Sequence, residues 1–323
     1  MLSRRDALFG AFAGAVEILR RGRRAFAAAS QPSTPVAFAV PPGACDCHTH
    51  AFGDPRRFPF APARVYTPEP ASVEEMRALH RALHMDRVVI VQPSVYGTDN
   101  ACTLDGIRQL GARARGVAVI DGSTPDQALE EMHRGGIRGV RLNLATAGVT
   151  DPEVARRRFN DTGERLKGRP WHIQLNTDLA MIDALHAQFA AATMPVVFDH
   201  FGGAQAALGT RQPGFETLVD LVRSGKAYIK ISGAYRSSTN APDYADVAPL
   251  ARALIAANVQ RVVWGTDWPH PDSVQVPGRR ATDIAPLLQI DDGRVLNQLA
   301  IWAPDPGTRK TILVDHPARL YQF

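Results

Sequence analysis

Residues 87–92 read RVVIVQ, in which four apolar residues follow one another without alternation. An unbroken apolar run of this length is typical of a strand that is buried on both faces, as in a parallel sheet covered by helices. Seven other segments of the chain have the same character. The eight predicted strands are residues 44–50, 87–92, 116–121, 137–142, 171–175, 195–200, 227–232 and 261–266.

Amphipathic segments with helical spacing lie between these strands. Ser72 precedes the first of them, with Glu74 and Glu75 in the first turn, which is a typical helix start. The predicted helices are residues 73–84, 124–134, 151–167, 179–191, 215–223 and 244–257. Eight strands that alternate with helices most simply close into a single-domain (β/α)8 TIM barrel, and a doubly wound open sheet is the alternative.

The composition is that of a globular protein, with 45% hydrophobic and 21% charged residues among 323. This excludes a disordered or collagen-like chain. No apolar run reaches about 18 residues, so we expect no stable membrane association. Most of the net charge of +5 lies in residues 1–29, where six arginines face two acidic residues, so the charge gives no support for a nucleic-acid partner. Three cysteines are too few for a disulfide framework.

The beginning of the chain resembles a twin-arginine export signal. The pair Arg4-Arg5 precedes a short apolar run that ends in small residues. We therefore expect residues 1–29 to be an export signal, residues 30–42 to be a Pro-rich linker and residues 43–323 to form the barrel. The expected location is the periplasm, or the cytoplasm if the signal is not functional.

Polar residues at the ends of strands are the candidate site residues, because barrel enzymes carry catalytic groups on the loops at the C-terminal ends of their strands. His48 and His50 end the first strand. Alternation puts both on one face together with Asp46, and Cys45 and Cys47 on the other. Two imidazoles at this spacing can ligate one cation. We expect the cysteines to pack beneath the helices as small hydrophobic residues.

Two further strand ends carry acidic and basic groups. The sixth strand ends with Asp199 and His200, of which alternation turns one into the barrel, and Asp267 follows the eighth strand. A carboxylate beside imidazoles can take a proton from water as general base, and it can also ligate a cation. Asp267 and His200 are therefore the catalytic candidates. We expect His270, three residues further on, to be a loop residue without a role in catalysis.

Taken together, these motifs resemble the amidohydrolase superfamily: H-x-H after strand one, DH after strand six and GTDWPH after strand eight. The segments CDCHTHAFGDP, VVIVQPSVYGTDN and IKISGAYR resemble, more narrowly, the branch that contains 2-pyrone-4,6-dicarboxylate lactonase and related lactone hydrolases. The resemblance implies a barrel of the metal-dependent-hydrolase type that opens an anionic lactone, such as a pyrone dicarboxylate or a muconolactone-type compound. Water activated by Asp267 would attack the lactone carbonyl.

The resemblance and the strand-end positions also indicate residues that bind the substrate, on the loops after strands one, two, four and seven. These candidates are Tyr66, Ser94, Tyr96, Arg141 and Arg236. A guanidinium group matches a carboxylate or sulfonate through two parallel hydrogen bonds. The arginines at 156–158, in contrast, are expected to form a solvated helix face.

The metal content stays open at this point. Strands four and five end without the metal-bridging residues of fuller amidohydrolases, so the resemblance does not imply a two-metal site. Either one divalent cation is bound, with Zn²⁺ the best fit to imidazole and carboxylate ligands, or none is. The ligands of a single cation would be His48, His50, His200 and Asp267.

Three alternative functions stay open as well. They are a zinc-dependent decarboxylase of an aromatic acid, a sugar-lactone hydrolase, and a periplasmic binding protein on a barrel that has lost catalysis. Release of CO2 would identify the decarboxylase, and tight binding without turnover the binding protein. The expected partner is a small-molecule lactone, and a homodimer remains an open question.

Overall fold

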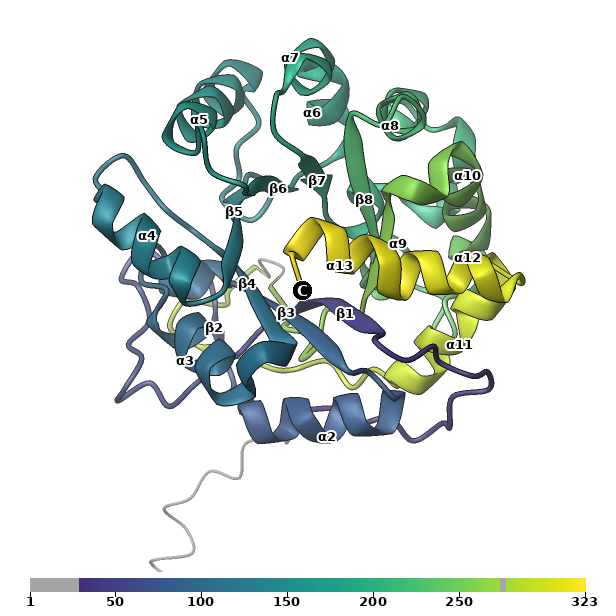
Figure 1. Cartoon of the computed structure of the whole chain (residues 1–323). Helices are drawn as coiled ribbons and strands as arrows, with labels where there is room; N and C mark the ends of the chain where they lie inside the picture. Colours follow the sequence, from purple (N-terminus) through teal and green to yellow (C-terminus); the bar gives the residue numbers. More distant parts are fainter. Residues whose placement is uncertain (1–28, 274–276) are drawn as a thin grey trace, which may run out of the picture.

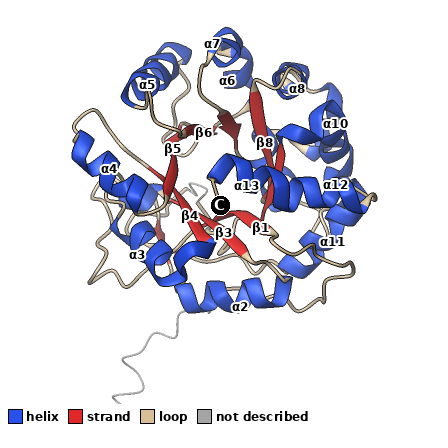
Figure 2. Cartoon of the chain, in the orientation of Figure 1, coloured by secondary structure: helices blue, strands red, loops and turns tan. Residues whose placement is uncertain are grey.

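An inner ring of strands lies inside an outer ring of helices (Figures 1 and 2) in the computed structural model, which describes residues 29–273 and 277–323. Eight parallel strands pair in the order β1-β3-β4-β5-β6-β7-β8-β9. Their bounds are β1 Cys45–Thr49, β3 Arg87–Val91, β4 Ala114–Ala118, β5 Ile137–Asn143, β6 His172–Asn176, β7 Val196–Phe198, β8 Ala227–Ser232 and β9 Val262–Gly265. This architecture confirms the predicted (β/α)8 barrel.

The ring closes between the last strand and the first, just beyond β9. The backbone N–H of Asp267 donates to the carbonyl of His48, and the N–H of His50 donates to the carbonyl of Trp268, both at 2.8 Å. Thr49 and Trp268 form a parallel bridge at the same place. Three of the candidate site residues therefore belong to the segments that close the barrel.

Helices cover the outside of the strands. Their bounds are α2 Val73–Leu83, α3 Ala101–Leu110, α4 Asp126–Arg134, α5 Pro152–Arg165, α6 Leu179–Ala184, α7 His186–Ala191, α8 Phe215–Arg223, α9 Ala234–Ser237, α10 Ala248–Asn258, α11 Asp292–Trp302, α12 Pro306–Lys310 and α13 His316–Tyr321. Ser72 caps α2 as predicted, because its hydroxyl accepts from the N–H of Glu75 while the Glu75 carboxylate accepts from the N–H of Ser72. A small second sheet pairs β2 (Thr67–Pro68) with β10 (Ile284–Ala285).

A bulge in β1 overturns the predicted orientation of its side chains. The register between β1 and β3 shifts between Asp46 and Thr49. Asp46 faces the helices, where one carboxylate oxygen lies 3.3 Å from Nε2 of His80 in α2. His48 instead points into the barrel, so the prediction that Asp46 and His48 share a face is wrong. An extra residue in a bulge breaks strict alternation, which lets consecutive side chains point the same way.

The two cysteines of β1 lie inside the barrel rather than beneath the helices, which corrects the second prediction for this strand. Cys45 and Cys47 pack in one buried cluster with side chains of β3, β4, β7, β8 and β9 and with Tyr321 of α13. Only the interior of the ring can bring residues of so many strands together. The cysteines still act as small hydrophobic residues, but they fill the barrel.

The last helix, α13, crosses the N-terminal end of the barrel (Figure 1). The ring of Tyr321 is fully buried and packs edge-on against His172, the first residue of β6, with 5.3 Å between ring centroids. Nζ of Lys230 lies 5.9 Å from the same ring. Because the chain itself fills this end, the candidate site lies at the opposite end, where the strands finish.

Side chains of the barrel hold the segment that precedes β1. The indole Nε1–H of Trp268 donates to the carbonyl of Ser30 at 2.9 Å. Asp291, the N-cap residue of α11, accepts from the hydroxyl groups of Ser33 and Thr34 at 2.7 Å each. The segment is thus tied both to the loop after β9 and to a helix.

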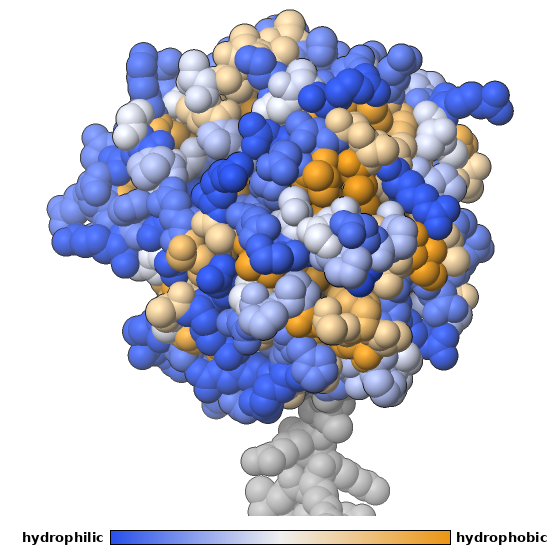
Figure 3. Space-filling view, turned by 45° about the vertical axis from the view of Figure 1, so that its right-hand side comes forward, coloured by the Kyte–Doolittle hydropathy of each residue, from blue (hydrophilic) through white to orange (hydrophobic). Residues whose placement is uncertain are grey.

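The surface seen in Figure 3 is largely hydrophilic, with smaller apolar areas between the polar residues. Within the described part of the chain, the exposed large hydrophobic side chains are Leu208, Ile284 and Ile301, each from a different element. No helix in that part has the length and apolar character that a membrane span requires. All of the predicted signal except Ala29 lies outside the described residues, so export, location and a homodimer stay predictions.

Candidate active site

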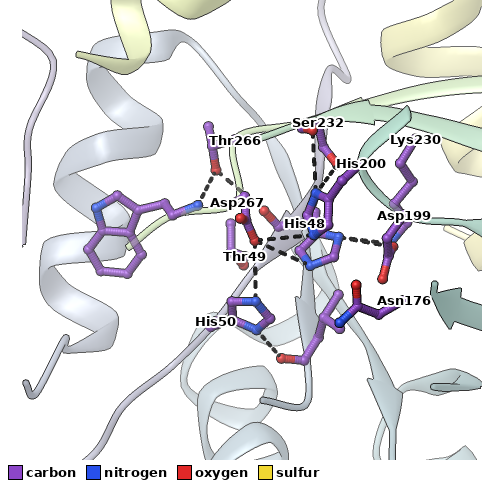
Figure 4. A network of polar contacts seen from close by, with 12 residues as sticks. His48, Thr49, His50, Asn176, Asp199, His200, Lys230, Ser232, Thr266 and Asp267 are labelled. Atoms are coloured by element: carbon purple, nitrogen blue, oxygen red, sulfur yellow. Dashed lines mark hydrogen bonds and ion pairs between the residues drawn. The ribbon is translucent and has the colours of Figure 1, made fainter. Parts of the chain in front are cut away.

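Four candidate side chains meet at the C-terminal end of the barrel (Figure 4). His48 lies in β1, His50 follows it, His200 begins the short helix η3 (His200–Gly203) after β7, and Asp267 follows β9. Oδ1 of Asp267 is their common point, because Nε2 of His50, His48 and His200 lies 3.3, 3.5 and 3.8 Å from it. All four residues are buried, which shields the cluster from bulk water.

The backbone is held in an uncommon conformation at two of these positions. His200 has φ 51° and Asp267 has φ 69°, in the left-handed region that residues with a side chain rarely adopt. β7 ends at Phe198, so alternation no longer applies at the turn, and both Asp199 and His200 reach the site. The prediction that only one of these two residues enters the barrel is therefore wrong.

Two glycines allow the close approach of the site segments. A Cβ at Gly265 would lie 2.6 Å from the backbone nitrogen of His48. A Cβ at Gly233 would lie 3.0 Å from Nδ1 of His200, and Gly233 also has φ 58°. Any side chain at either position would displace one of the histidines, so both positions are part of how the site is built.

Each imidazole points Nδ1 at an oxygen acceptor and Nε2 at Asp267. The Nδ1 contacts are His48 with Asp199 Oδ1 at 3.2 Å, His50 with the Val91 carbonyl at 2.8 Å, and His200 with the Ser232 carbonyl at 3.3 Å. A carbonyl oxygen can only accept, so the contact with Val91 places the ring proton of His50 on Nδ1. Nδ1 of His200 also lies 3.0 Å from the Ser232 hydroxyl, and Nδ1 of His48 lies 3.5 Å from Nζ of Lys230. All three Nε2 atoms face the same carboxylate oxygen.

The convergence of three Nε2 atoms on one carboxylate oxygen fits a bound cation. Nε2 of His48 and Oδ1 of Asp267 are buried, and neither has a hydrogen-bond partner among the described residues. Buried acceptors that face one another repel unless a cation or a shared proton lies between them. The ligand atoms of His48, His200 and Asp267 lie within 4.8 Å of one another, whereas His50 is not part of that group. Two imidazoles and a carboxylate are a ligand set that suits Zn²⁺.

The second oxygen of Asp267 is fixed by two donors from α9. The hydroxyl of Tyr235 donates to Oδ2 at 2.6 Å, and Nε of Arg236 donates to it at 2.5 Å. Burial by itself raises the pKa of Asp267, but the nearby charge of Arg236 and the histidines together hold that pKa well below its usual range. Asp267 is therefore an ionised carboxylate with one oxygen held and the other free to react.

A second buried carboxylate, Asp199, supports His48 from behind. Nε and Nη2 of Arg141 both lie 3.0 Å from Asp199 Oδ2, and Nζ of Lys230 lies 3.6 Å from Oδ1. Lys230 also donates to the Cys47 carbonyl at 2.9 Å and to Gln174 Oε1 at 2.7 Å. Sequence reasoning missed Lys230. A lysine within an otherwise apolar strand, AYIKIS, is the signal that could have identified it, because lysine is rarely buried unless paired.

Four of the five predicted substrate-binding residues lie around this cluster. Tyr66 is buried, which raises its pKa to about 12, and Arg236 and Arg141 lie close enough to oppose that rise. Ser94, in the short helix η1 (Ser94–Tyr96), and Arg141 both line a cavity of about 460 Å³ at the ends of β3, β4 and β5. The structure thus brings these four residues to one end of the barrel.

Two other residues make contacts outside this cluster. The hydroxyl of Tyr96 accepts from the backbone N–H of Gly53 at 3.1 Å, so the structure does not turn it toward Asp267. His270 is fully buried, with Nε2 at 2.9 Å from Asp292 Oδ2, and its ring packs edge-on against Tyr235. His270 therefore lies in a loop, as expected, but it is buried and packs against the tyrosine that binds the site carboxylate.

A family model described as amidohydrolase matches residues 45–323. The chain belongs to the amidohydrolase family. It is 36% identical over 290 residues to 4-sulfomuconolactone hydrolase of Hydrogenophaga intermedia, which covers 89% of this chain and 91% of that relative. It is 33% identical over 301 residues to 2-pyrone-4,6-dicarboxylate hydrolase of Comamonas testosteroni, covering 90% and 94%.

A solved structure from Pseudomonas putida, provisionally named 2-pyrone-4,6-dicarboxylic acid hydrolase, has the same fold. The TM-score is 0.73 at 30% sequence identity, and the match covers 88% of this chain and 98% of that one. These similarities confirm the predicted amidohydrolase family, and with it an enzyme.

Proposed function

We propose that this protein hydrolyses the ring ester of an anionic lactone. The observation that carries the proposal is Oδ1 of Asp267, a buried carboxylate oxygen without a hydrogen-bond partner in the described part of the chain, at the centre of three imidazoles. The relatives named as hydrolases of 4-sulfomuconolactone and 2-pyrone-4,6-dicarboxylate support a lactone as the substrate.

In the proposed reaction, Oδ1 of Asp267 takes a proton from a water molecule, and the water oxygen forms a bond to the lactone carbonyl carbon. The carbonyl oxygen becomes an oxyanion in the tetrahedral intermediate. The bond between this carbon and the ring oxygen then breaks, and the leaving oxygen takes the proton back from Asp267. Tyr235 and Arg236 keep the carboxylate oriented through both steps, because they bind its other oxygen.

His48, His200 and Asp267 would hold a divalent cation, for which we propose Zn²⁺, with His50 adjacent to the carboxylate. When bound, such an ion supplies Lewis-acid stabilisation of negative charge that develops on the carbonyl oxygen. Asp199 supports the binding of such an ion, because it contacts Nδ1 of His48 and leaves Nε2 of the same ring free to ligate.

The proposed substrate contacts are made by Tyr66, Ser94, Arg141 and Arg236. Two guanidinium groups near the reacting centre suit a substrate that carries a carboxylate or sulfonate. We assign no contact to the hydroxyl of Tyr96, because it is bound to Gly53. We further propose, from the Arg4-Arg5 signal, that the protein is exported to the periplasm, which fractionation of cells that express the full chain tests.

The test is a lactone panel that contains pyrone dicarboxylate, muconolactones with and without sulfonate, and aldonolactones. We expect ring opening of an anionic member and a fall of about 10²- to 10⁴-fold in kcat for Asp267→Asn. Asp220→Asn, which changes an exposed carboxylate on α8, is the matched control and should leave kcat unchanged. A chelator should abolish activity, and added Zn²⁺ should restore it.

Other outcomes of this panel would overturn the proposal. Release of CO2 from aromatic acids without lactone opening would identify a decarboxylase. Binding of a lactone without turnover by the metal-loaded protein would identify a binding protein. Opening of aldonolactones alone would identify a sugar-lactone hydrolase.

A further inference from the structure

The cavity that Ser94 and Arg141 line reaches helix α5. Besides the ends of β3, β4 and β5, its wall includes one face of helix α5, with Arg158, Asp161 and Arg165. Its volume of about 460 Å³ lies in the range of small-molecule sites. Two residues proposed to bind the substrate, Ser94 and Arg141, thus share one cavity with α5.

Arg141 connects this cavity to the reacting centre. Two of its nitrogens, Nε and Nη2, are bound to Asp199, whose other oxygen lies 3.2 Å from Nδ1 of His48. Two of the three guanidinium nitrogens of Arg141 are thus occupied within the protein, which leaves Nη1 for one anionic group of the substrate. A second anionic group needs a second cation.

Arg158 offers such a cation. It lines the cavity from an exposed position, and it has no hydrogen bond or ion pair with any part of the chain that the structure describes. Arg165, two turns further along the same helix face, is already engaged, since it binds Asp126 and the carbonyl of Thr124. Asp161 also lines the cavity and reduces its positive charge.

The neighbouring arginines of the helix do not share this position. Arg156 forms an ion pair with Glu153, and Arg157 is exposed but does not line the cavity. The expectation that residues 156–158 form a solvated face fits Arg157 and Arg158, which are both exposed, but Arg158 also lines the cavity. A guanidinium without a partner in a cavity that Ser94 and Arg141 also line suits an oxyanion ligand.

We propose that Arg158 binds a second anionic group of the substrate, a carboxylate or a sulfonate, in the cavity that Ser94 and Arg141 line. This inference rests on the proposed lactone hydrolysis and makes Arg158 a specificity residue, which selects dianionic over monoanionic lactones. It takes no part in the chemical step, so its effect falls on KM rather than on kcat.

The test compares two matched substrate pairs that differ by one anionic group. Muconolactone and 4-sulfomuconolactone differ by a sulfonate, and 2-pyrone-6-carboxylate and 2-pyrone-4,6-dicarboxylate differ by a carboxylate. We expect Arg158→Met to raise KM about tenfold for the dianionic member of the recognised pair. KM of the monoanionic member should change less than twofold, and the pair that responds identifies the oxyanion.

Arg157→Met is the matched control, because it removes the same charge one residue away on the same helix. It should leave both members unchanged. Asp161→Asn, which removes the opposing charge, should lower KM of the dianionic member. Equal changes of KM in Arg158→Met and Arg157→Met would show a general effect of surface charge and would overturn the inference. No change of KM in Arg158→Met would overturn it as well.

Failure of the inference differs from failure of the proposed function. If the protein opens lactones but Arg158→Met has no effect, only the specificity role is wrong. If the protein opens none of them, calorimetric binding of 2-pyrone-4,6-dicarboxylate to the wild-type protein and to Arg158→Met still measures the anion site. Weaker binding by the variant would then support the anion site at Arg158, although the protein would not be a lactone hydrolase.

Discussion

Lys230 places a positive charge inside the barrel with no exposed surface. Burial lowers its pKa, and the nearby Asp199 opposes that shift. Asp199 in turn lies against His48, so the lysine, the carboxylate and the imidazole form one connected network. A buried charge that loses its partner is costly, so each member of this network depends on the others.

Replacing Lys230 by Met should therefore destabilise the protein by about 3 kcal/mol, because Asp199 would keep only Arg141 as a cationic partner. Urea unfolding measures the loss. Lys167→Met is the control, since Lys167 is exposed beside Glu164 and its replacement should change the free energy of unfolding by less than about 0.5 kcal/mol. A similar small change for Lys230→Met would contradict the assigned role.

Tyr235→Phe removes the hydroxyl that donates to Asp267 Oδ2 and keeps the ring. We expect kcat for lactone opening to fall about tenfold with little change in KM, because a hydrogen bond to a charged group is worth about 1.5–3 kcal/mol. Tyr228→Phe is the control, since that hydroxyl accepts from Arg261, outside the site cluster. Equal losses of kcat in both variants would mean that the Tyr235 hydroxyl contributes only to stability.

At the residue scale, the sequence predicted those site residues that lie at the ends of strands. His48 lies in β1 just before the strand ends at Thr49, and His50, His200 and Asp267 follow strands. Parallel strands of a barrel finish at one end, so the meeting of these residues could be predicted. The role of Asp199 could not, because the chain leaves the strand at that point and alternation fails. Which oxygen of Asp267 is held, and by which donors, depends on side chains of α9 that no strand-end pattern identifies.

At the scale of elements, Asp291 joins two segments far apart in the chain. It caps α11 by accepting from the N–H of Gly293, and it holds the hydroxyl groups of Ser33 and Thr34. One carboxylate thus stabilises a helix end and fixes the segment that precedes β1. That segment in turn meets the loop of Trp268.

Asp291→Ala should cost about 2 kcal/mol or more, because it removes the helix cap and the two hydroxyl contacts together. We also expect faster hydrogen exchange in residues 31–38. Asp305→Ala removes a cap of α12 that holds only its own helix, so it should cost about 1 kcal/mol and leave exchange in that segment unchanged. Unchanged exchange in Asp291→Ala would show that other contacts hold the segment.

Helices and strands could be predicted where hydrophobic pattern determines them. The predicted strands differ from the observed ones by at most three residues at either end, because each is an apolar run bounded by polar loops. Helix α3 escaped prediction. It has Gly106 in its middle, where a Cβ would lie 2.8 Å from a carbon of Ile90, so close helix–strand packing rather than helix propensity determines that residue.

At the scale of the whole molecule, the barrel should lose stability in acid because it buries neutral histidine. Both ring nitrogens of His172 lack hydrogen-bond partners within the described chain. Burial, with a smaller contribution from the charge of Lys230, lowers the pKa of His172 to about 3. In the unfolded chain its pKa is about 6.5, so between these values the unfolded state binds a proton that the folded state does not.

Stability should therefore fall as the pH drops below 6.5, by about 2–3 kcal/mol from this residue alone at pH 4.5. Urea unfolding at a series of pH values measures the slope. His172→Gln should show a shallower slope between pH 6.5 and 4.5, whatever its absolute stability. His186→Gln, which changes an exposed histidine of α7, should keep the wild-type slope. Parallel slopes for all three proteins would contradict this source of acid sensitivity.

The position of Tyr321 has a consequence for how the protein is made. Every side chain of the catalytic cluster has been synthesised by residue 267, yet the interior beneath it stays open until α13 is added. A ribosome that stops after residue 315 releases a chain that has the whole catalytic cluster but lacks α13. The valine and cysteine side chains inside the barrel are then exposed at its N-terminal end. We expect proteases to degrade such a product, so that incomplete copies of the enzyme do not accumulate.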